Sequence, residues 1–117
     1  MNTSNQHNIS KEDLYKKYLN TVSGINFTLR EIDIMSCVLH NRGNKKTADI
    51  LSISYRTVES HIRNIIGKIN KASRDDIIDF IEKSHVLAHF NTYYTWMLTR
   101  YYFKNCLLKI AKINQQE

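Results

Sequence analysis

The sequence predicts an all-α protein. The chain of 117 residues contains no proline and only three glycines, so few of its segments are forced to turn. Alternating runs of β-branched and aromatic residues, which are typical of strands, are absent. Apolar residues instead recur at the three- and four-residue spacing of amphipathic helices. We therefore expect one helical domain with room for a small second element.

The first predicted helix covers residues 11–21. Residues 1–9 are polar and are expected to be disordered, and Ser10 is the candidate N-cap. The apolar stripe of this helix comprises Leu14, Tyr15, Tyr18, Leu19 and Val22. Residues 21–26 are predicted to form a linker. Residues 1–26 are therefore interpreted as a disordered start followed by an N-terminal helix.

The clearest helix start in the chain lies at Thr28. Thr28 and Glu31 have the T-x-x-E spacing of a capping box, in which each side chain satisfies a free backbone amide. Phe27 and Ile32 occupy the positions of a hydrophobic staple. A helix over about 29–40 is expected to follow.

Three shorter segments complete the central part of the chain. Helices are predicted over 44–51 and 55–70, joined by a tight turn in which Ser54 caps the second helix. Another helix is predicted over 74–83, with Ser73 as its cap and acidic residues near its positive end.

The helix over 55–70 has two distinct faces. On a helical wheel its apolar residues lie on one side: Val58, Ile62, Ile65, Ile66 and Ile69. Ser60, Arg63 and Asn64 lie on the other side, with Glu59 at the edge. Two short helices joined by a tight turn form a helix-turn-helix, whose second helix enters the major groove of DNA. There Arg63 can contact guanine, Glu59 can accept from the cytosine amino group, and Ser60 can do either.

Positive charge is concentrated around this helix. The whole chain has a formal net charge of +6 and a pI near 9.4, and residues 42–71 hold seven basic and two acidic side chains. A basic surface suits a polyanion but does not distinguish nucleic acid, a membrane surface and an acidic protein. The candidate phosphate contacts are Lys45, Lys46, Arg56, Lys68 and Lys71. The same pattern is compatible with the solvated face of a structural bundle.

A set of motifs covers residues 27–83. It comprises FTLREIDIM (27–35), NKKTADILSIS (44–54), TVESHIRNIIGKI (57–69) and Arg74. In order and spacing these motifs resemble the LuxR/FixJ/GerE-type DNA-binding domain. The resemblance implies a four-helix domain that binds operator DNA, usually as a dimer on two half-sites, here in a stand-alone regulator.

The resemblance also implies roles for individual residues. Glu59, Ser60 and Arg63 occupy the base-facing positions of the family. Thr57, Asn64 and Lys68 occupy positions nearer the phosphates, the first two adding to the set of candidate phosphate contacts.

Residues 84–117 lie outside the resemblance and are predicted to form an aromatic C-terminal extension, either one long helix or two broken near 91–92. One face comprises Phe90, Tyr93, Tyr94, Met97, Tyr101 and Leu108, and a second comprises Trp96, Phe103, Leu107 and Ile110. A helix that is apolar on two sides must be buried on more than one side. We expect the first face to pack against the N-terminal helix and the second to form a homodimer contact. The alternatives are one larger monomeric core and, as a poorer fit, a membrane-surface helix.

Neither a catalytic site nor a metal site is predicted. His85 and His89, and likewise Cys37 and His40, form pairs without a fixed framework of further ligands. A glycine-rich phosphate loop and a nucleophile–base set are also missing from the sequence. We therefore expect a protein that is not an enzyme and has no cofactor or metal. A polar start and the lack of a long apolar run predict a cytoplasmic protein with reduced cysteines.

Taken together, these patterns predict a bacterial, sequence-specific DNA-binding transcription regulator that acts as a homodimer on double-stranded DNA. RNA polymerase or another regulator is a further candidate partner. The alternative is a non-enzymatic protein–protein interaction adaptor that keeps the helix-turn-helix fold.

Overall fold

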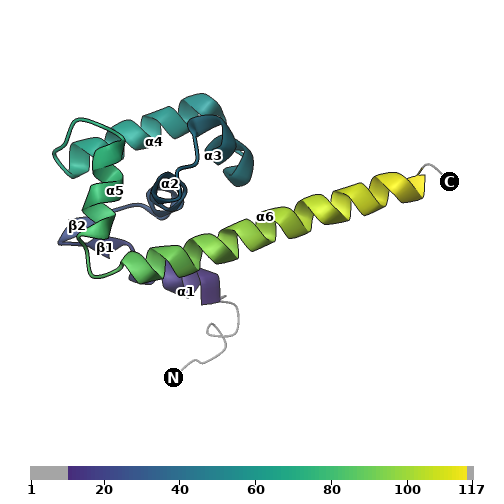
Figure 1. Ribbon diagram of the computed structural model, residues 1–117, viewed down its shortest axis with the longest axis horizontal. Helices are drawn as coiled ribbons and strands as arrows, with labels where there is room; N and C mark the ends of the chain where they lie inside the picture. Colours follow the sequence, from purple (N-terminus) through teal and green to yellow (C-terminus); the bar gives the residue numbers. More distant parts are fainter. Residues whose placement is uncertain (1–10, 116–117) are drawn as a thin grey trace, which may run out of the picture.

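The computed structural model describes the backbone of residues 11–115 and the side chains of residues 14–114 (Figure 1). Its elements are α1 (Lys11–Tyr18), β1 (Thr21–Val22), β2 (Ile25–Asn26), α2 (Leu29–Leu39), α3 (Asn44–Leu51), α4 (Tyr55–Lys68), α5 (Asp75–Glu82) and α6 (Leu87–Gln115). The predicted all-α class is confirmed, with the addition of one small strand pair. The expected disorder of residues 1–9 and the expected Ser10 cap lie outside the described residues.

Helix α2 lies at the centre of the fold, seen end-on in Figure 1 with α3, α4 and α5 around it and α6 crossing on its other side. It packs against α1, α3, α4, α5 and α6, and all eight residues from 31 to 38 are buried. The predicted capping box is confirmed. The Glu31 amide donates to Thr28 Oγ1 at 3.1 Å, and the Thr28 amide donates to Glu31 Oε1 at 2.8 Å.

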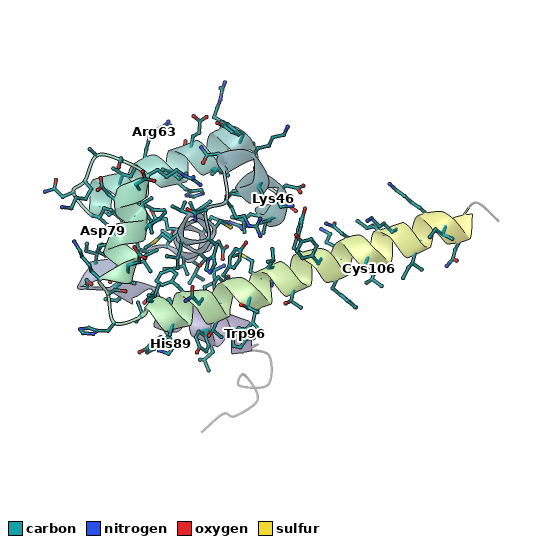
Figure 2. The ribbon with its side chains drawn as sticks, viewed as in Figure 1. Lys46, Arg63, Asp79, His89, Trp96 and Cys106 are labelled. Carbon is teal, nitrogen blue, oxygen red and sulfur yellow. The ribbon has the colours of Figure 1, made fainter. Side chains whose placement is uncertain are left out.

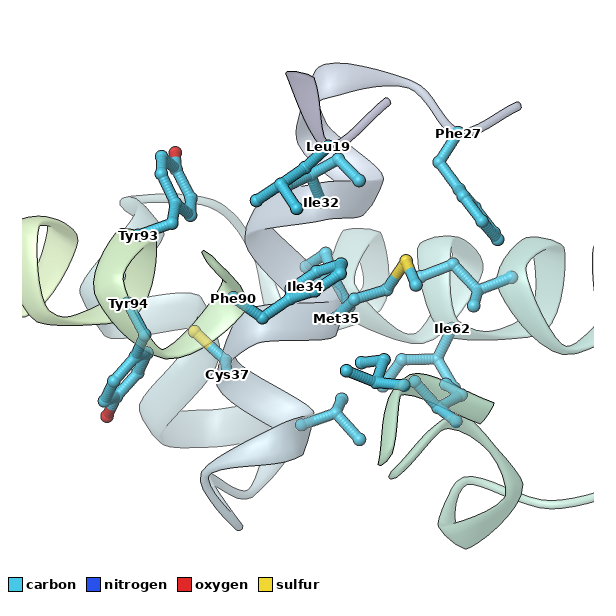
Figure 3. Packing of buried hydrophobic residues seen from close by; sticks show 14 of the residues in the cluster. Leu19, Phe27, Ile32, Ile34, Met35, Cys37, Ile62, Phe90, Tyr93 and Tyr94 are labelled. Carbon is cyan, nitrogen blue, oxygen red and sulfur yellow. The ribbon is translucent and has the colours of Figure 1, made fainter. Parts of the chain in front are cut away.

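One hydrophobic core joins the three segments into which the sequence was divided (Figure 3). Leu19 directly follows α1, Ile32 and Met35 come from α2, and Phe90 and Tyr93 come from α6, and each of these side chains is at most 1% exposed. Because the core is continuous, α1 and α6 pack as parts of the same domain as the helix-turn-helix.

The helix-turn-helix itself consists of α3 and α4, as predicted. The turn between them includes Ser52, whose backbone adopts the left-handed conformation with φ 56°. Ser54 caps α4, and its Oγ accepts from the Thr57 amide at 3.0 Å. This cap fixes the direction in which α4 leaves the turn.

Two local predictions differ from the structure. The expected linker at 21–26 is an antiparallel hairpin in which Val22 pairs with Ile25, and the turn residues Ser23 and Gly24 both have positive φ. The expected Ser73 cap of α5 is wrong. The carboxylate of Asp76 instead accepts from the amides of Ala72 and Ser73 and from the Ser73 hydroxyl, which lowers the pKa of Asp76.

Helix α6 is one continuous helix of 29 residues, without the break considered near 91–92. Its first half buries Phe90, Tyr93, Tyr94 and Met97 and packs on both α1 and α2, so the expected contact with the N-terminal helix is only part of this packing. Its second half projects beyond the rest of the molecule (Figure 1).

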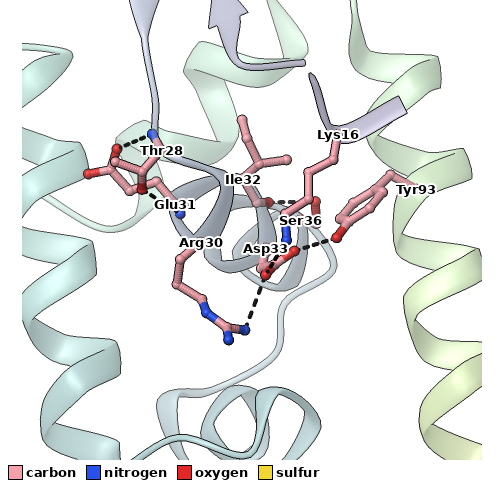
Figure 4. A network of polar contacts seen from close by, with 8 residues as sticks. All are labelled: Lys16, Thr28, Arg30, Glu31, Ile32, Asp33, Ser36 and Tyr93. Carbon is pink, nitrogen blue, oxygen red and sulfur yellow. Dashed lines mark hydrogen bonds and ion pairs between the residues drawn. The ribbon is translucent and has the colours of Figure 1, made fainter. Parts of the chain in front are cut away.

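A buried carboxylate on α2 holds α1 and α6 in place (Figure 4). Asp33 is 3% exposed and accepts from the Tyr93 hydroxyl of α6. Its other oxygen accepts from Lys16 Nζ of α1 at 2.9 Å and from Arg30 Nη1 at 3.2 Å. A buried carboxylate is stable only when it is paired in this way, so the network makes the position of α6 specific.

The Asp33 network generates a first prediction. Tyr93→Phe should lower the free energy of unfolding by about 1–3 kcal/mol, because a hydrogen bond to a charged, buried acceptor is lost. Tyr102→Phe removes a hydroxyl from an exposed ring of the same helix and should change the free energy by less than about 0.5 kcal/mol. Urea unfolding followed by circular dichroism measures both values. Equal stability of the two variants would contradict a structural role of the Tyr93–Asp33 contact.

Candidate nucleic-acid interface

The apolar face of α4 is buried as the helical wheel predicts. Val58, Ile62 and Ile65 lie in the core, together with Ile69 just beyond the helix, whereas Ile66 is half-buried. These side chains pack α4 against α2 and α3. Because one face is held by the core, the polar face is held in a fixed orientation toward solvent.

The three predicted base-facing residues lie on that outer side. Arg63 is exposed and points away from the domain (Figure 2), whereas Glu59 and Ser60 are half-buried. Arg63 Nη2 donates to Ser60 Oγ at 3.2 Å, so the guanidinium lies along the helix above the hydroxyl. A guanidinium, a hydroxyl and a carboxylate thus lie within about one helical turn of each other. These are groups that can form hydrogen bonds with base edges in a major groove.

Six of the seven candidate phosphate contacts are exposed. Five of the six surround this face, namely Lys45, Arg56, Thr57, Asn64 and Lys71, and the sixth is Lys68. Thr57 lies in the first turn of α4, where its amide and hydroxyl both interact with Ser54. The exposed set therefore surrounds the polar face of α4 from the first residues of α3 to the loop after α4.

The other two candidates, Lys68 and Lys46, have partners inside the domain. Lys68 Nζ donates to Glu31 Oε1 at 2.6 Å and to the Asn26 carbonyl at 3.1 Å. Lys46 Nζ donates to the Tyr101 hydroxyl of α6 at 3.3 Å, a contact that raises the pKa of Lys46. A phosphate contact by either lysine would have to compete with these interactions.

The loop between α2 and α3 carries a cluster that the sequence did not predict. Arg74 donates to the Arg42 carbonyl, while Arg42 Nε donates to the Tyr94 hydroxyl of α6. The His40 ring stacks on Tyr94 with 3.9 Å between the ring centroids. The motif included Arg74, but Arg42 and Tyr94 are 52 positions apart in the sequence, so no local pattern indicated their contact. The cluster ties the start of the helix-turn-helix to α5 and α6.

His89 and Cys37 are placed as packing residues, whereas His85 and Cys106 are exposed. His89 hydrogen-bonds the Tyr15 hydroxyl through Nδ1 at 3.0 Å, and burial raises the pKa of Cys37 to about 12, an effect that the Thr47 hydroxyl offsets only in part. Within residues 14–114 no group of three or more His, Cys, Asp or Glu side chains could hold a metal ion. In the described part of the chain, no helix is long and apolar enough to cross a membrane.

This combination of fold and surface defines the class: a helix-turn-helix protein whose second helix presents a polar, partly basic face to solvent. Residues 26–81 match the family described as "Bacterial regulatory proteins, luxR family" (GerE), so the chain contains a helix-turn-helix domain of that family.

Several bacterial regulators are similar to this chain. The transcriptional regulatory protein TdiR of Thauera aromatica is 31% identical over 77 residues, which cover 66% of this chain and 33% of TdiR. The oxygen regulatory protein NreC of Staphylococcus carnosus is 33% identical over 58 residues, 50% of this chain and 27% of NreC. The nitrate/nitrite response regulator protein NarP of Escherichia coli is 43% identical over 47 residues, 40% of this chain and 22% of NarP. The chain thus spans a third or less of these relatives, and no solved structure gives a significant match.

The raised pKa of Cys37 generates a second prediction. At pH 8 the folded protein should hold Cys37 as a thiol that reacts with a disulfide reagent at least about 100-fold more slowly than a free cysteine, because the thiolate is the reacting species. The measurement is made on Cys106→Ser, so that only Cys37 is titrated. Urea should restore fast reaction; fast reaction of the folded variant would contradict the burial of this thiol.

Proposed function

We propose that this protein is a sequence-specific regulator of transcription that inserts α4 into the major groove of double-stranded DNA. The observation that carries the proposal is the outward face of α4, where Arg63, Ser60 and Glu59 lie together on a helix whose opposite side is fixed in the core. Arg63 pairs with guanine, and Glu59 or Ser60 with a neighbouring base. The bacterial cytoplasm, where such DNA lies, is the proposed site of action.

Glu59 supports base reading more than general DNA affinity. A carboxylate at the edge of a DNA-facing helix repels phosphates, so it weakens non-specific binding. Its compensating interaction is acceptance of a hydrogen bond from the cytosine amino group, which only some sequences offer. The five phosphate candidates around this face position the helix without selecting a sequence.

We further propose that two copies of the chain associate through the projecting half of α6. Phe103 and Ile110 are seven residues apart, as are Cys106 and Ile113, and the spacing between the two pairs alternates three and four. All four residues are exposed, with Phe103 65% and Ile113 61% exposed, and Leu107 borders the same stripe.

Such a stripe suits a second copy of the same helix. Lys104 and Lys112 lie on the sides of α6 that point away from the seam, so two copies bring together apolar side chains without opposing these cations. Trp96 continues the row seven residues before Phe103, but its ring packs edge-on against Tyr15 of α1, with 4.9 Å between centroids. Among the four predicted dimer residues, Trp96 therefore supports the domain, whereas Phe103, Leu107 and Ile110 supply exposed surface.

The adaptor alternative uses the same projecting stripe to bind another protein, such as RNA polymerase or a second regulator. It differs from the regulator proposal in making no use of the polar face of α4. Binding to duplex DNA therefore separates the two functions.

DNA binding generates a third prediction. After selection of a preferred sequence from random duplexes, Arg63→Ala should lower the preference for it over a scrambled duplex by about 1–3 kcal/mol, through the loss of a bidentate guanine contact. Lys45→Ala should weaken both duplexes alike and reduce the slope of log affinity against log salt by about 1. Fluorescence anisotropy at several salt concentrations measures both effects. Lys112→Ala is the matched control, because it removes a cation from the far end of α6.

Two results would contradict this function. Wild-type protein that binds no duplex at low salt would favour the adaptor. If Arg63→Ala and Lys45→Ala weaken the binding of both duplexes equally, the protein binds duplex DNA, but α4 does not read the bases.

The dimer generates a fourth prediction. Phe103→Ser combined with Ile110→Ser should convert a dimeric wild type into a monomer with unchanged stability of the domain, because both side chains are exposed outside the core. Leu108→Ser, which removes a 54% exposed leucine from the opposite side of α6, should leave the dimer intact. Light scattering gives the mass. A monomeric wild type, or an equal effect of Leu108→Ser, would exclude this dimer surface.

A further inference from the structure

A groove lies between α3 and the middle of α6, on the side of α6 that faces the domain. Its volume is about 430 Å³, within the range of small-molecule sites. Its walls are formed by Arg30, the last residues of α3 with Ser52, and the part of α6 between Met97 and Leu108. The groove is separate from the exposed stripe of α6 and from the polar face of α4.

Hydrogen bonds hold the two walls apart at a fixed separation. The Tyr101 hydroxyl of α6 donates to the Asp49 carboxylate of α3, and Lys46 Nζ donates to the same hydroxyl at 3.3 Å. The Lys46 ammonium also lies 4.9 Å from the centre of the Tyr101 ring. Tyr101 therefore bridges α6 and α3, so the groove is a built feature of the fold.

The groove combines an apolar floor with a cationic rim. Ile50, Leu51 and Met97 are each less than 10% exposed and supply the floor. The charged side chains of the lining are Arg30, Arg100, Lys104 and Asp49, three cations and one carboxylate. Three cations against one carboxylate give the lining a net positive charge, and the carboxylate also accepts a hydrogen bond from the Tyr101 hydroxyl.

Arg30 can serve an additional acceptor. Its Nη1 donates to Asp33 at 3.2 Å, its side chain is 44% exposed, and a guanidinium has five N–H donors. Lys104 is exposed on the facing wall. A carboxylate or phosphate between the two would accept charge-assisted hydrogen bonds from both walls.

We propose that this groove binds a small amphipathic anion, with a carboxylate or phosphate head at Arg30 and Lys104 and an apolar body on Ile50, Leu51 and Met97. Both parts of the ligand contribute, because the cations alone are solvated and the apolar floor alone is small. The ligand contacts Ser52 in the turn of the helix-turn-helix, which places it beside the DNA-binding element.

The groove and the proposed dimer stripe lie on opposite sides of α6. Met97, Tyr101 and Lys104 are spaced by four and three residues along one side, whereas Phe103 and Ile110 follow the other. Occupation of the groove therefore leaves the stripe exposed, and the proposal is independent of dimerisation.

Three probes test the proposal on the full chain without DNA, so its outcome is separate from that of DNA binding. Decanoate below its micelle concentration carries both features, decanol lacks the charge, and inorganic phosphate lacks the apolar body. Amide shifts in ¹H–¹⁵N spectra report binding. Decanoate should give saturable shifts at Leu51, Ser52 and Asn105, with an affinity at least about fivefold higher than decanol or phosphate.

Matched charge reversals complete the test. Lys104→Glu should weaken decanoate binding about fivefold or more, whereas Lys112→Glu, an exposed lysine two turns further along α6, should change it less than about twofold. Circular dichroism checks that both variants are folded. The proposal is overturned by the absence of saturable decanoate shifts at these residues, by equal binding of decanol or phosphate, or by equal effects of the two reversals.

Discussion

Two buried carboxylates at the start of α2 hold the rest of the structure together. Glu31 and Asp33 are each 3% exposed, and burial of an unpaired carboxylate would cost several kcal/mol. Glu31 caps α2 and pairs with Lys68 at the end of α4, whereas Asp33 receives Lys16 from α1 and Tyr93 from α6. Each carboxylate therefore needs partners from other helices, and satisfying both determines where α1, α4 and α6 lie around α2.

Helix α4, the proposed recognition helix, is fixed at both of its ends by this arrangement. Ser54 caps its start, and Lys68 ties its last turn to Glu31. Between these two points the isoleucine face packs on α2 and α3. A helix held at its start, its end and along one side has little freedom to rotate, so Arg63 and Ser60 are presented to solvent in one orientation. Such preorganisation lowers the entropic cost of a base contact.

Local signals in the sequence predict most of this fold, and non-local contacts account for the differences. The Thr28–Glu31 box, the Ser54 cap and the isoleucine spacing each lie within one or two helical turns, and all three are confirmed. The hairpin at 21–26 was missed because two-residue strands show no alternation. The pairing of Lys68 with Glu31 spans 37 residues, and no pattern in the sequence marks such a contact.

These non-local contacts change the expected electrostatics of the interface. Of the cations counted around α4, Lys68 neutralises a buried carboxylate and Lys46 binds the aromatic side of α6. The charge left to attract phosphates is therefore smaller than the composition of residues 42–71 suggests, and Glu59 reduces it further. Phosphate contacts contribute affinity in proportion to the number of cations that release counterions. Under the proposed function, a domain with fewer available cations obtains a larger share of its DNA affinity from base contacts, and the proposal therefore makes Arg63 the residue on which binding depends.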